Sequence, residues 1–275
     1  SITGDFLTVV HNWPVPGLGL KGIAFSALTA SCVACLLSLY KISRSDLAPC
    51  LKLLTPVIPD MIKRVIKIGI PSAAQRMAWA TSVFVLFYIL ARCPQPTEAL
   101  ASWAVGMRIE GLMFMPVMAL SMAVSSIVGQ NLGAKEVERA YTAGWHVTFI
   151  GVGLLTVLAT LLFVLAEPIA GLMCKDPVTI EYVTSYLRIN ALSEPWLALG
   201  MILGGAFQGA GDTKTPMWIT FITNWVIRLP LAYYLALNFK LGPQGVWWAM
   251  TSSVVIMGLL TAWRYRSRSW TRLYI

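Results

Sequence analysis

Long apolar stretches are the feature that most constrains the fold of this 275-residue chain. About 20 apolar residues are enough for a helix to cross roughly 30 Å of hydrocarbon. Stretches of this length cover residues 20–42, 65–92, 99–129, 141–166, 182–208, 216–238 and 244–265. None of them has the alternating pattern of an outer-membrane barrel strand. The sequence therefore predicts an all-α polytopic membrane protein with about seven transmembrane helices.

Composition and charge placement agree with this prediction. The chain is 57% hydrophobic and 12% charged, whereas soluble domains carry roughly twice that share of charge. One set of loops holds Lys41, Arg44, Lys52, Lys63, Arg64, Lys67, Lys135, Arg139, Lys214, Arg264, Arg266, Arg268 and Arg272. The opposite loops hold only Arg92, Lys175 and Lys240. The positive-inside rule makes the basic side cytoplasmic and predicts a cytoplasmic C-terminus. Topology thus accounts for the net charge of +9, and no nucleic-acid partner is expected.

Residues that bind metals or perform catalysis are scarce. The cysteines are Cys32, Cys35, Cys50, Cys93 and Cys174. The first two lie one helical turn apart in an apolar span without a neighbouring His or carboxylate, which favours packing over a metal or redox pair. The two histidines, His11 and His146, stand alone. We expect no disulfide framework, catalytic residue, metal site or cofactor, and no enzymatic activity.

A partial internal repeat suggests how the chain is organised. Residues 18–41 resemble residues 241–264 at a constant offset of 223, and each segment opens with Leu-Gly-x-x-Gly before an apolar span. A unit of that length cannot occur twice in this chain. We therefore predict the end of a first lobe over residues 1–42, a cytoplasmic inter-lobe linker over 43–64, and a second, six-helix lobe over 65–275. The missing first lobe, or a second copy of the chain, would be the protein partner.

The polar stretch AFQGAGDTKTP, residues 206–216, fits either a phosphate-binding loop or a turn between two helices. A Walker A loop needs Lys after its second Gly, whereas Ala follows Gly209. Gly209 and Gly211 are suited to ending one helix, and Asp212 or Thr213 can cap the next. These features favour the turn between helices.

Several segments together resemble the MATE family of multidrug and toxic compound extrusion antiporters. They are IKIGIPSAAQ (66–75), MPVMALSMAVSSIVGQNLGAKEVERA (115–140), GAFQGAGDTKTPM (205–217), NWVIRLPLAYYL (224–235) and LGPQGVWWA (241–249). The resemblance covers nearly the whole chain in the family's order. It implies two six-helix lobes in the plasma membrane, the inner membrane of a bacterium. It also implies export of drug-like cationic or amphipathic compounds in exchange for H⁺ or Na⁺ by alternating access.

Charged residues within spans are candidates for ion coupling, because a charge near mid-bilayer is costly. Glu194 precedes Pro195 and follows Asn190 by four residues, which predicts that Glu194 and Asn190 share one helix face at a bend. Burial raises the affinity of a carboxylate for protons and suits it to proton exchange. A capped helix kink is the alternative for Glu194. Glu110 is either a proton or cation site or the partner of an Arg on another helix.

Four polar residues are candidates for the substrate pathway. Asn224 and Arg228 lie four apart, so they face one side of a helix. Gln75 and Arg76 follow a Gly and a Pro in the first span of the proposed second lobe. In Na⁺-type members of the family a Glu lies further along that helix, whereas Trp79 takes its approximate place here. This departure puts the family's usual cation site in this lobe in doubt.

Two other functions compete with multidrug efflux. A lipid-linked saccharide flippase of the same superfamily would use an Arg-lined cavity, and four Arg residues fall within the predicted spans: Arg76, Arg108, Arg188 and Arg228. A seven-helix receptor also fits the number of spans, but the sequence has neither a DRY nor an NPxxY motif and the repeat would be unexplained. Multidrug efflux is therefore the leading prediction, with membrane lipid surrounding the protein.

Overall fold

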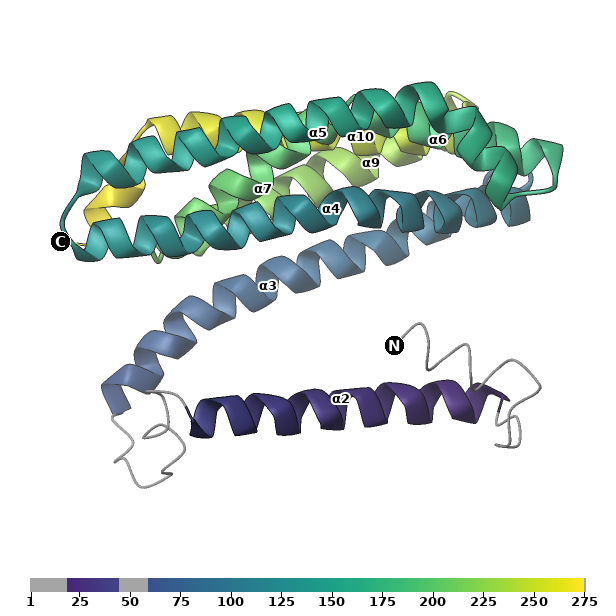
Figure 1. The fold of residues 1–275 in the computed structure, drawn as a ribbon. Coiled ribbons are helices and arrows are strands. Elements are labelled where there is room, and N and C mark those ends of the chain that lie inside the picture. The colour runs from purple at the N-terminus through teal and green to yellow at the C-terminus, as the bar shows by residue number, and fades with distance from the viewer. Residues whose placement is uncertain (1–18, 45–58, 275) are drawn as a thin grey trace. The chain divides into compact units, whose positions relative to one another are not determined.

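A computed structural model describes residues 19–44 and 59–274, and it is helical without strands in these ranges (Figure 1). The α-helices are α2 (Gly19–Ser43), α3 (Pro59–Leu90), α4 (Pro96–Gly133), α5 (Val137–Met173), α6 (Pro177–Ala191), α7 (Glu194–Gly209), α8 (Lys214–Phe221), α9 (Leu229–Tyr233) and α10 (Pro243–Arg266). Two π-helical segments, η2 (Ile222–Arg228) and η3 (Tyr234–Asn238), flank α9, and a 3₁₀ helix, η4 (Ser269–Tyr274), follows α10. The all-α prediction is confirmed.

The chain divides into two compact units, Ser1–Ile62 and Lys63–Ile275. The two segments of the predicted repeat both form helices, and adding 223 to the last residue of α2 gives Arg266, the last residue of α10. This correspondence is in keeping with a repeated helix. Most of the linker predicted over 43–64, and Cys50 with it, lies outside the described residues, so the domain boundaries stay a prediction.

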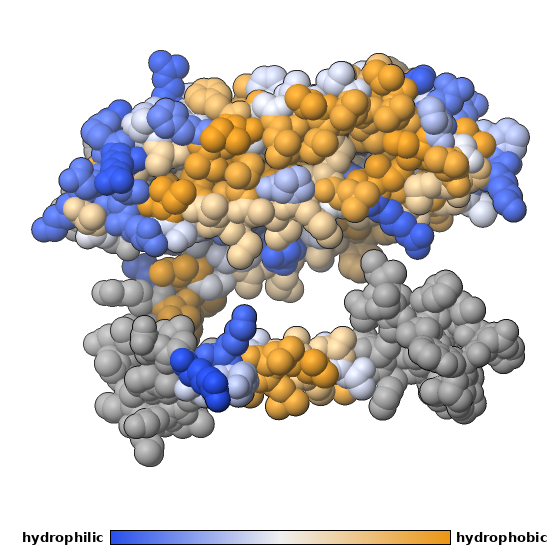
Figure 2. All heavy atoms as spheres, viewed as in Figure 1, coloured by the Kyte–Doolittle hydropathy of each residue, from blue (hydrophilic) through white to orange (hydrophobic). Residues whose placement is uncertain are grey.

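The outer surface of the second unit is suited to lipid. Helix α5 buries a stripe of mainly small residues: Ala140, Gly144, Thr148, Gly151, Leu155, Ala159, Leu162, Ala166 and Ala170. Its large apolar side chains face outward instead, among them Phe149, Ile150, Val157, Leu161 and Val164. Figure 2 shows apolar residues over the middle of this unit and hydrophilic ones toward its ends. Small residues inside and large apolar residues outside are typical of membrane helix bundles.

Four of the described helical stretches are long and apolar enough to cross a membrane: Val65–Leu90, Pro96–Gly133, Val137–Met173 and Pro243–Arg266. The stretch expected as one helix over 182–208 is instead divided into α6 and α7. Pro195 explains the break, because it has no N–H to donate to the carbonyl of Ala191 and its ring would collide with that carbonyl. The expectation of a single helix there is corrected.

Residues 214–238 are helical throughout, as expected, but the helix changes type. In the π-helical segments the bonds span five residues: the amide of Leu229 donates to the carbonyl of Asn224, and that of Phe239 to Tyr234. Pro230 lies between these segments and cannot donate. Single π turns often occur at functional sites, and η2 carries Asn224 and Arg228.

Helix α7 lies at the centre of the unit and packs against α4, α5 and α10. Its close approach to α4 depends on glycines. A Cβ on Gly205 would lie 2.3 Å from the carbonyl oxygen of Ser121, and a Cβ on Gly209 would lie 2.1 Å from that of Ser125. Both pairs are spaced by four residues, so a Gly-xxx-Gly face meets a Ser-xxx-Ser face.

The segment 206–216 forms the predicted turn. Helix α7 ends at Gly209, Gly211 has a φ of 80° that favours glycine, and α8 begins at Lys214. The Asp212 carboxylate accepts hydrogen bonds from the amide of Thr215 at 3.1 Å and from its hydroxyl at 2.7 Å. Asp212 therefore caps the first turn of α8. Because the Thr215 amide already donates to this carboxylate, it is not available to bind a phosphate.

Candidate functional site

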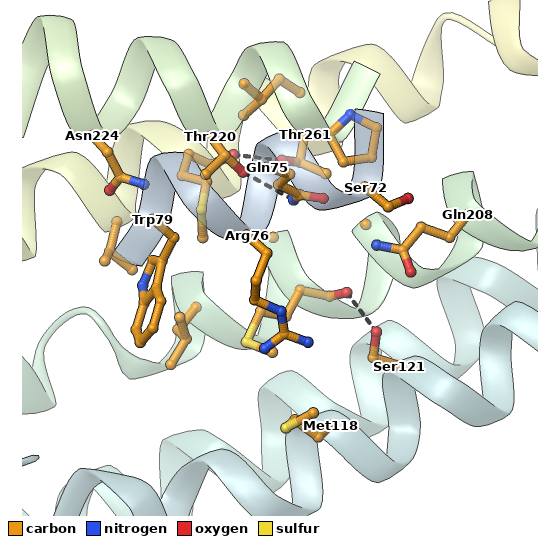
Figure 3. Close-up of a pocket in the computed structure, with 18 of the residues that line it drawn as sticks. Ser72, Gln75, Arg76, Trp79, Met118, Ser121, Gln208, Thr220, Asn224 and Thr261 are labelled. Atoms are coloured by element: carbon orange, nitrogen blue, oxygen red, sulfur yellow. Dashed lines mark hydrogen bonds between the residues drawn. The ribbon is translucent and has the colours of Figure 1, made fainter. Parts of the chain in front are cut away.

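A cavity of about 500 Å³ lies within the second unit, between α3, α4, α7, the α8–η2 segment and α10. Its lining is mostly apolar and includes Trp79, Phe114, Met118 and Met122. Aromatic rings and flexible methionines can adapt to apolar bodies of different shape, and a cavity of this size is in the usual range for drug-sized molecules. Figure 3 shows the polar side chains that lie among them.

All four candidates for the substrate pathway, Gln75, Arg76, Asn224 and Arg228, line this one cavity. The Gln75 amide donates to the Thr220 hydroxyl at 3.0 Å, which ties α3 to α8 (Figure 3). One turn along α3, the carbonyl of Ala78 accepts a hydrogen bond of 3.0 Å from the indole of Trp225. These two bonds hold the α3 wall against the α8–η2 wall. The structure brings the four residues together, and their role in transport stays a prediction.

Arg228 connects the cavity to the interior of the unit. The residue is 8% exposed, and its Nε donates to the Ser253 hydroxyl on α10 at 2.7 Å. Its guanidinium also interacts electrostatically with the Glu110 carboxylate. A buried guanidinium needs such partners, since an unpaired charge in a low-dielectric interior is expensive.

Both candidate coupling carboxylates belong to one group of interacting residues outside the cavity lining. Glu110 on α4 accepts a hydrogen bond from the hydroxyl of Tyr186 on α6, so a tyrosine and not an arginine donates to it in the described structure. Glu194, at the first position of α7, is 2% exposed and interacts electrostatically with Glu110. Its Oε2 has no hydrogen-bond partner among the described residues. Two like charges brought together with an unsatisfied oxygen favour binding of a proton or a cation.

Asn190 does not share a helix with Glu194, contrary to expectation. It lies one residue before the end of α6, and two residues outside either helix separate α6 from α7. Its amide donates to the carbonyl of Tyr186 at 3.1 Å, and its oxygen accepts from the Thr251 hydroxyl at 3.4 Å. No described hydrogen bond joins it to Glu194. The break before Pro195 removes the common face, and Asn190 instead joins α6 to α10.

Three further residues each contact a candidate residue but do not stand out in the sequence: Tyr186, Ser253 and Thr251. For Tyr186 a signal was present, because it lies four residues before Asn190 and therefore on the same face of α6. Ser253 and Thr251 carry no such signal, since nothing in the local sequence of α10 shows which helix it faces.

Among the described residues, no group of three His, Cys, Asp or Glu side chains gathers in a way that could hold a metal ion. The cluster of Glu110, Glu194 and Tyr186 contains two carboxylates and a phenol. These groups can exchange protons or contribute to a monovalent cation site.

Comparison with known proteins gives consistent matches. A family model described as MatE matches residues 71–234. A probable multidrug resistance protein NorM of Thermotoga maritima is 27% identical over 98% of this chain and 57% of its own length. A protein of the same name from Mannheimia succiniciproducens is 30% identical, over 96% of this chain and 58% of its own.

Among solved structures, a MATE transporter, ClbM, in complex with Rb⁺ is similar over 100% of this chain and 60% of its own, with a TM-score of 0.81 and 22% identity. This similarity concerns the fold. The chain thus spans about 60% of the length of the relatives that it matches.

Proposed function

The chain belongs to the MatE family, and on this premise we propose that it forms one lobe of a multidrug efflux antiporter. The lobe would export amphipathic compounds in exchange for H⁺ or Na⁺. The observation that carries the proposal is the position of the carboxylate cluster. Glu110 and Glu194 each lie about one helical turn before a residue that lines the drug-sized cavity, Phe114 and Leu197 respectively. Arg228 both lines that cavity and interacts with Glu110. An antiporter requires a substrate site and an ion site, and the occupancy of each must change the affinity of the other.

In the proposed mechanism the cavity and the cluster bind in alternation. An apolar body packs against Trp79 and the methionines, while polar groups meet Gln75, Arg76 and Asn224. When a proton or Na⁺ occupies the Glu110–Glu194 cluster, the carboxylates no longer attract Arg228 as strongly. The guanidinium is then free to change its contacts with the cavity. The names of the curated relatives support the export of drugs, and the Rb⁺ bound by a structural neighbour supports a cation site.

Alternating access needs a second lobe, and either a first lobe of the same protein or a second copy of this chain would supply it. We further propose a multi-pass protein in the bacterial inner membrane with a cytoplasmic C-terminus. The distribution of Lys and Arg among the loops supports this orientation.

The flippase alternative has less support from the cavity. Of the four arginines within the predicted spans only Arg76 and Arg228 line it. Its volume also suits a drug-sized molecule better than a lipid-linked saccharide.

Dye efflux from everted membrane vesicles tests the proposal. We expect an imposed H⁺ or Na⁺ gradient to drive dye movement by the wild type, and Glu194→Gln and Glu110→Gln to reduce the gradient-driven rate by at least about tenfold, as loss of a charged group that binds the coupling ion would. Glu181→Gln, which alters an exposed carboxylate on α6, is the matched control and should behave as wild type. Dye movement that ignores both gradients would contradict the proposal.

A further inference from the structure

The charged residues that line the cavity are all basic. Among the described lining residues, Arg76 and Arg228 carry charge and no Asp or Glu is present. Within this lobe a cationic substrate would therefore face two guanidinium groups and no described carboxylate. These lining charges do not suit the cationic substrates that the family resemblance implies.

Arg228 is already engaged by the protein. Its Nε donates to Ser253, and its charge interacts with that of Glu110, which does not line the cavity. Its charge is therefore partly offset from within the unit, so Arg228 attracts an anion less strongly than an unpaired guanidinium would.

Arg76 has no such balance. Its side chain is exposed, and Figure 3 shows it extending from α3 into the cavity, on the side where Met118 and Ser121 of α4 lie. No described acidic side chain lies within ion-pair distance of it: the described ion pairs join Arg188 to Glu167 and Arg268 to Glu138. Its guanidinium therefore offers free donors in a cavity with mostly apolar walls.

A guanidinium in this setting selects for a particular head group. Its planar fork of N–H donors matches a carboxylate, sulfonate or phosphate with two parallel hydrogen bonds. The guanidinium attracts an anionic group and repels a cationic one, and the apolar walls beside it can pack the rest of such a molecule. The neutral polar residues nearby, Gln208 and Asn224, can satisfy further acceptors of the same group.

We infer that the cavity takes amphiphiles that bear an anionic group, with Arg76 binding that group and the aromatic and methionine walls packing the apolar body. The inference rests on the proposed function, since it names the substrate class of the same site. The anionic group belongs either to a soluble compound or to a lipid headgroup.

Binding of three matched dyes to the purified full chain tests this inference. The dyes are dansyl amides with one short linker that ends in a carboxylate, a carboxamide or a trimethylammonium group, and fluorescence reports their affinities. We expect the carboxylate dye to bind at least about tenfold more tightly than the trimethylammonium dye, as a charge-assisted pair allows. Arg76→Gln should abolish this preference and leave the carboxamide dye unaffected, while Arg76→Lys should keep part of it.

Arg108→Gln is the control, because Arg108 is exposed on α4 and does not line the cavity. If phosphatidylglycerol in the micelles displaces the carboxylate dye from the wild type, the anionic group is that of a lipid; without displacement it is that of a soluble compound. Tightest binding of the trimethylammonium dye, or equal effects of Arg76→Gln and Arg108→Gln, would overturn the inference and leave the proposed function standing. If none of the three dyes binds, the proposed function fails as well.

Discussion

Tyr186 links two residues that matter for the proposed coupling. Its hydroxyl donates to Glu110, its ring packs edge-on against Trp247 with centroids 4.8 Å apart, and its backbone carbonyl accepts from Asn190. The ring also fills the space beside Gly106, where a Cβ would lie 2.4 Å from ring carbons. The hydroxyl is therefore held in place by packing on all of these sides, which lets it define the position of the Glu110 carboxylate.

Tyr186→Phe removes this donor without changing the packing. A hydrogen bond to a charged group is worth about 1.5–3 kcal/mol, so we expect the pH dependence of dye efflux to shift while the protein stays folded. Tyr182→Phe on the same helix is the control, because that hydroxyl bonds to Gln95 at 3.1 Å, away from the cluster. Identical pH profiles for wild type and Tyr186→Phe would show that the bond has no part in coupling.

The candidate residues could be predicted from sequence one by one, but their arrangement could not. Glu110, Glu194 and Arg228 are conspicuous because charge within an apolar span is costly. The bond between Tyr186 and Glu110 joins residues 76 apart, and that between Gln75 and Thr220 joins residues 145 apart. Such pairings depend on which helices are neighbours, and hydropathy contains no information about that.

At the scale of elements, the apolar stretches, and the Gly and Pro residues at their ends, correctly predict the positions of most helices. The turn at 210–213 follows from its glycines and Asp212. The sequence predicts a bend within 182–208, because sequence alone does not distinguish a kinked helix from two helices. The π-helical turns around Pro230 have no sequence signature of comparable strength.

The α4–α7 contact yields a prediction about packing. A Cβ at Gly209 meets the backbone of Ser125, which cannot move aside as a flexible side chain would. Gly209→Ala should therefore destabilise the protein by about 1–3 kcal/mol, the usual cost of overpacking. Gly153→Ala is the control, since no atom lies within 4 Å of a Cβ there. Thermal unfolding in detergent measures both, and equal melting temperatures would refute the close contact.

The start of α6 yields a prediction about pH. The amide and hydroxyl of Thr179 donate to the Asp176 carboxylate, each at 2.8 Å, and hold the pKa of Asp176 below its ordinary value. A lowered pKa in the folded state means that the charged cap stabilises the helix start above the ordinary Asp pKa, and that this stability is lost as the pH falls through the folded value.

Asp176→Ala should therefore speed hydrogen exchange at the Thr179 amide near neutral pH, and Asp176→Asn should largely preserve protection because Asn also caps helices. The difference between wild type and Asp176→Ala should shrink in acid. Exchange by Asp176→Ala that matches the wild type at neutral pH would show that the cap does not protect this amide.

At the scale of the whole molecule, the distribution of residue sizes indicates where the protein resides. Helix α5 places small residues against its neighbours and large apolar ones outside, which in water would expose an extensive apolar surface. In a bilayer the same surface is matched to its surroundings. The chain spans about 60% of the length of its relatives. A second lobe, facing this one across a shared pathway, would complete the proposed antiporter.

The central claim is that the cavity and the carboxylate cluster are energetically linked, and the most direct test is the affinity of the neutral carboxamide dye for the purified chain as pH and Na⁺ concentration vary. Linkage requires each ligand to change the affinity of the other by the same factor. We expect the dissociation constant of the dye to change by at least about fivefold with H⁺ or Na⁺ in the wild type, and to stay constant in the double variant Glu110→Gln/Glu194→Gln. A wild-type dissociation constant that is independent of both cations would contradict the account.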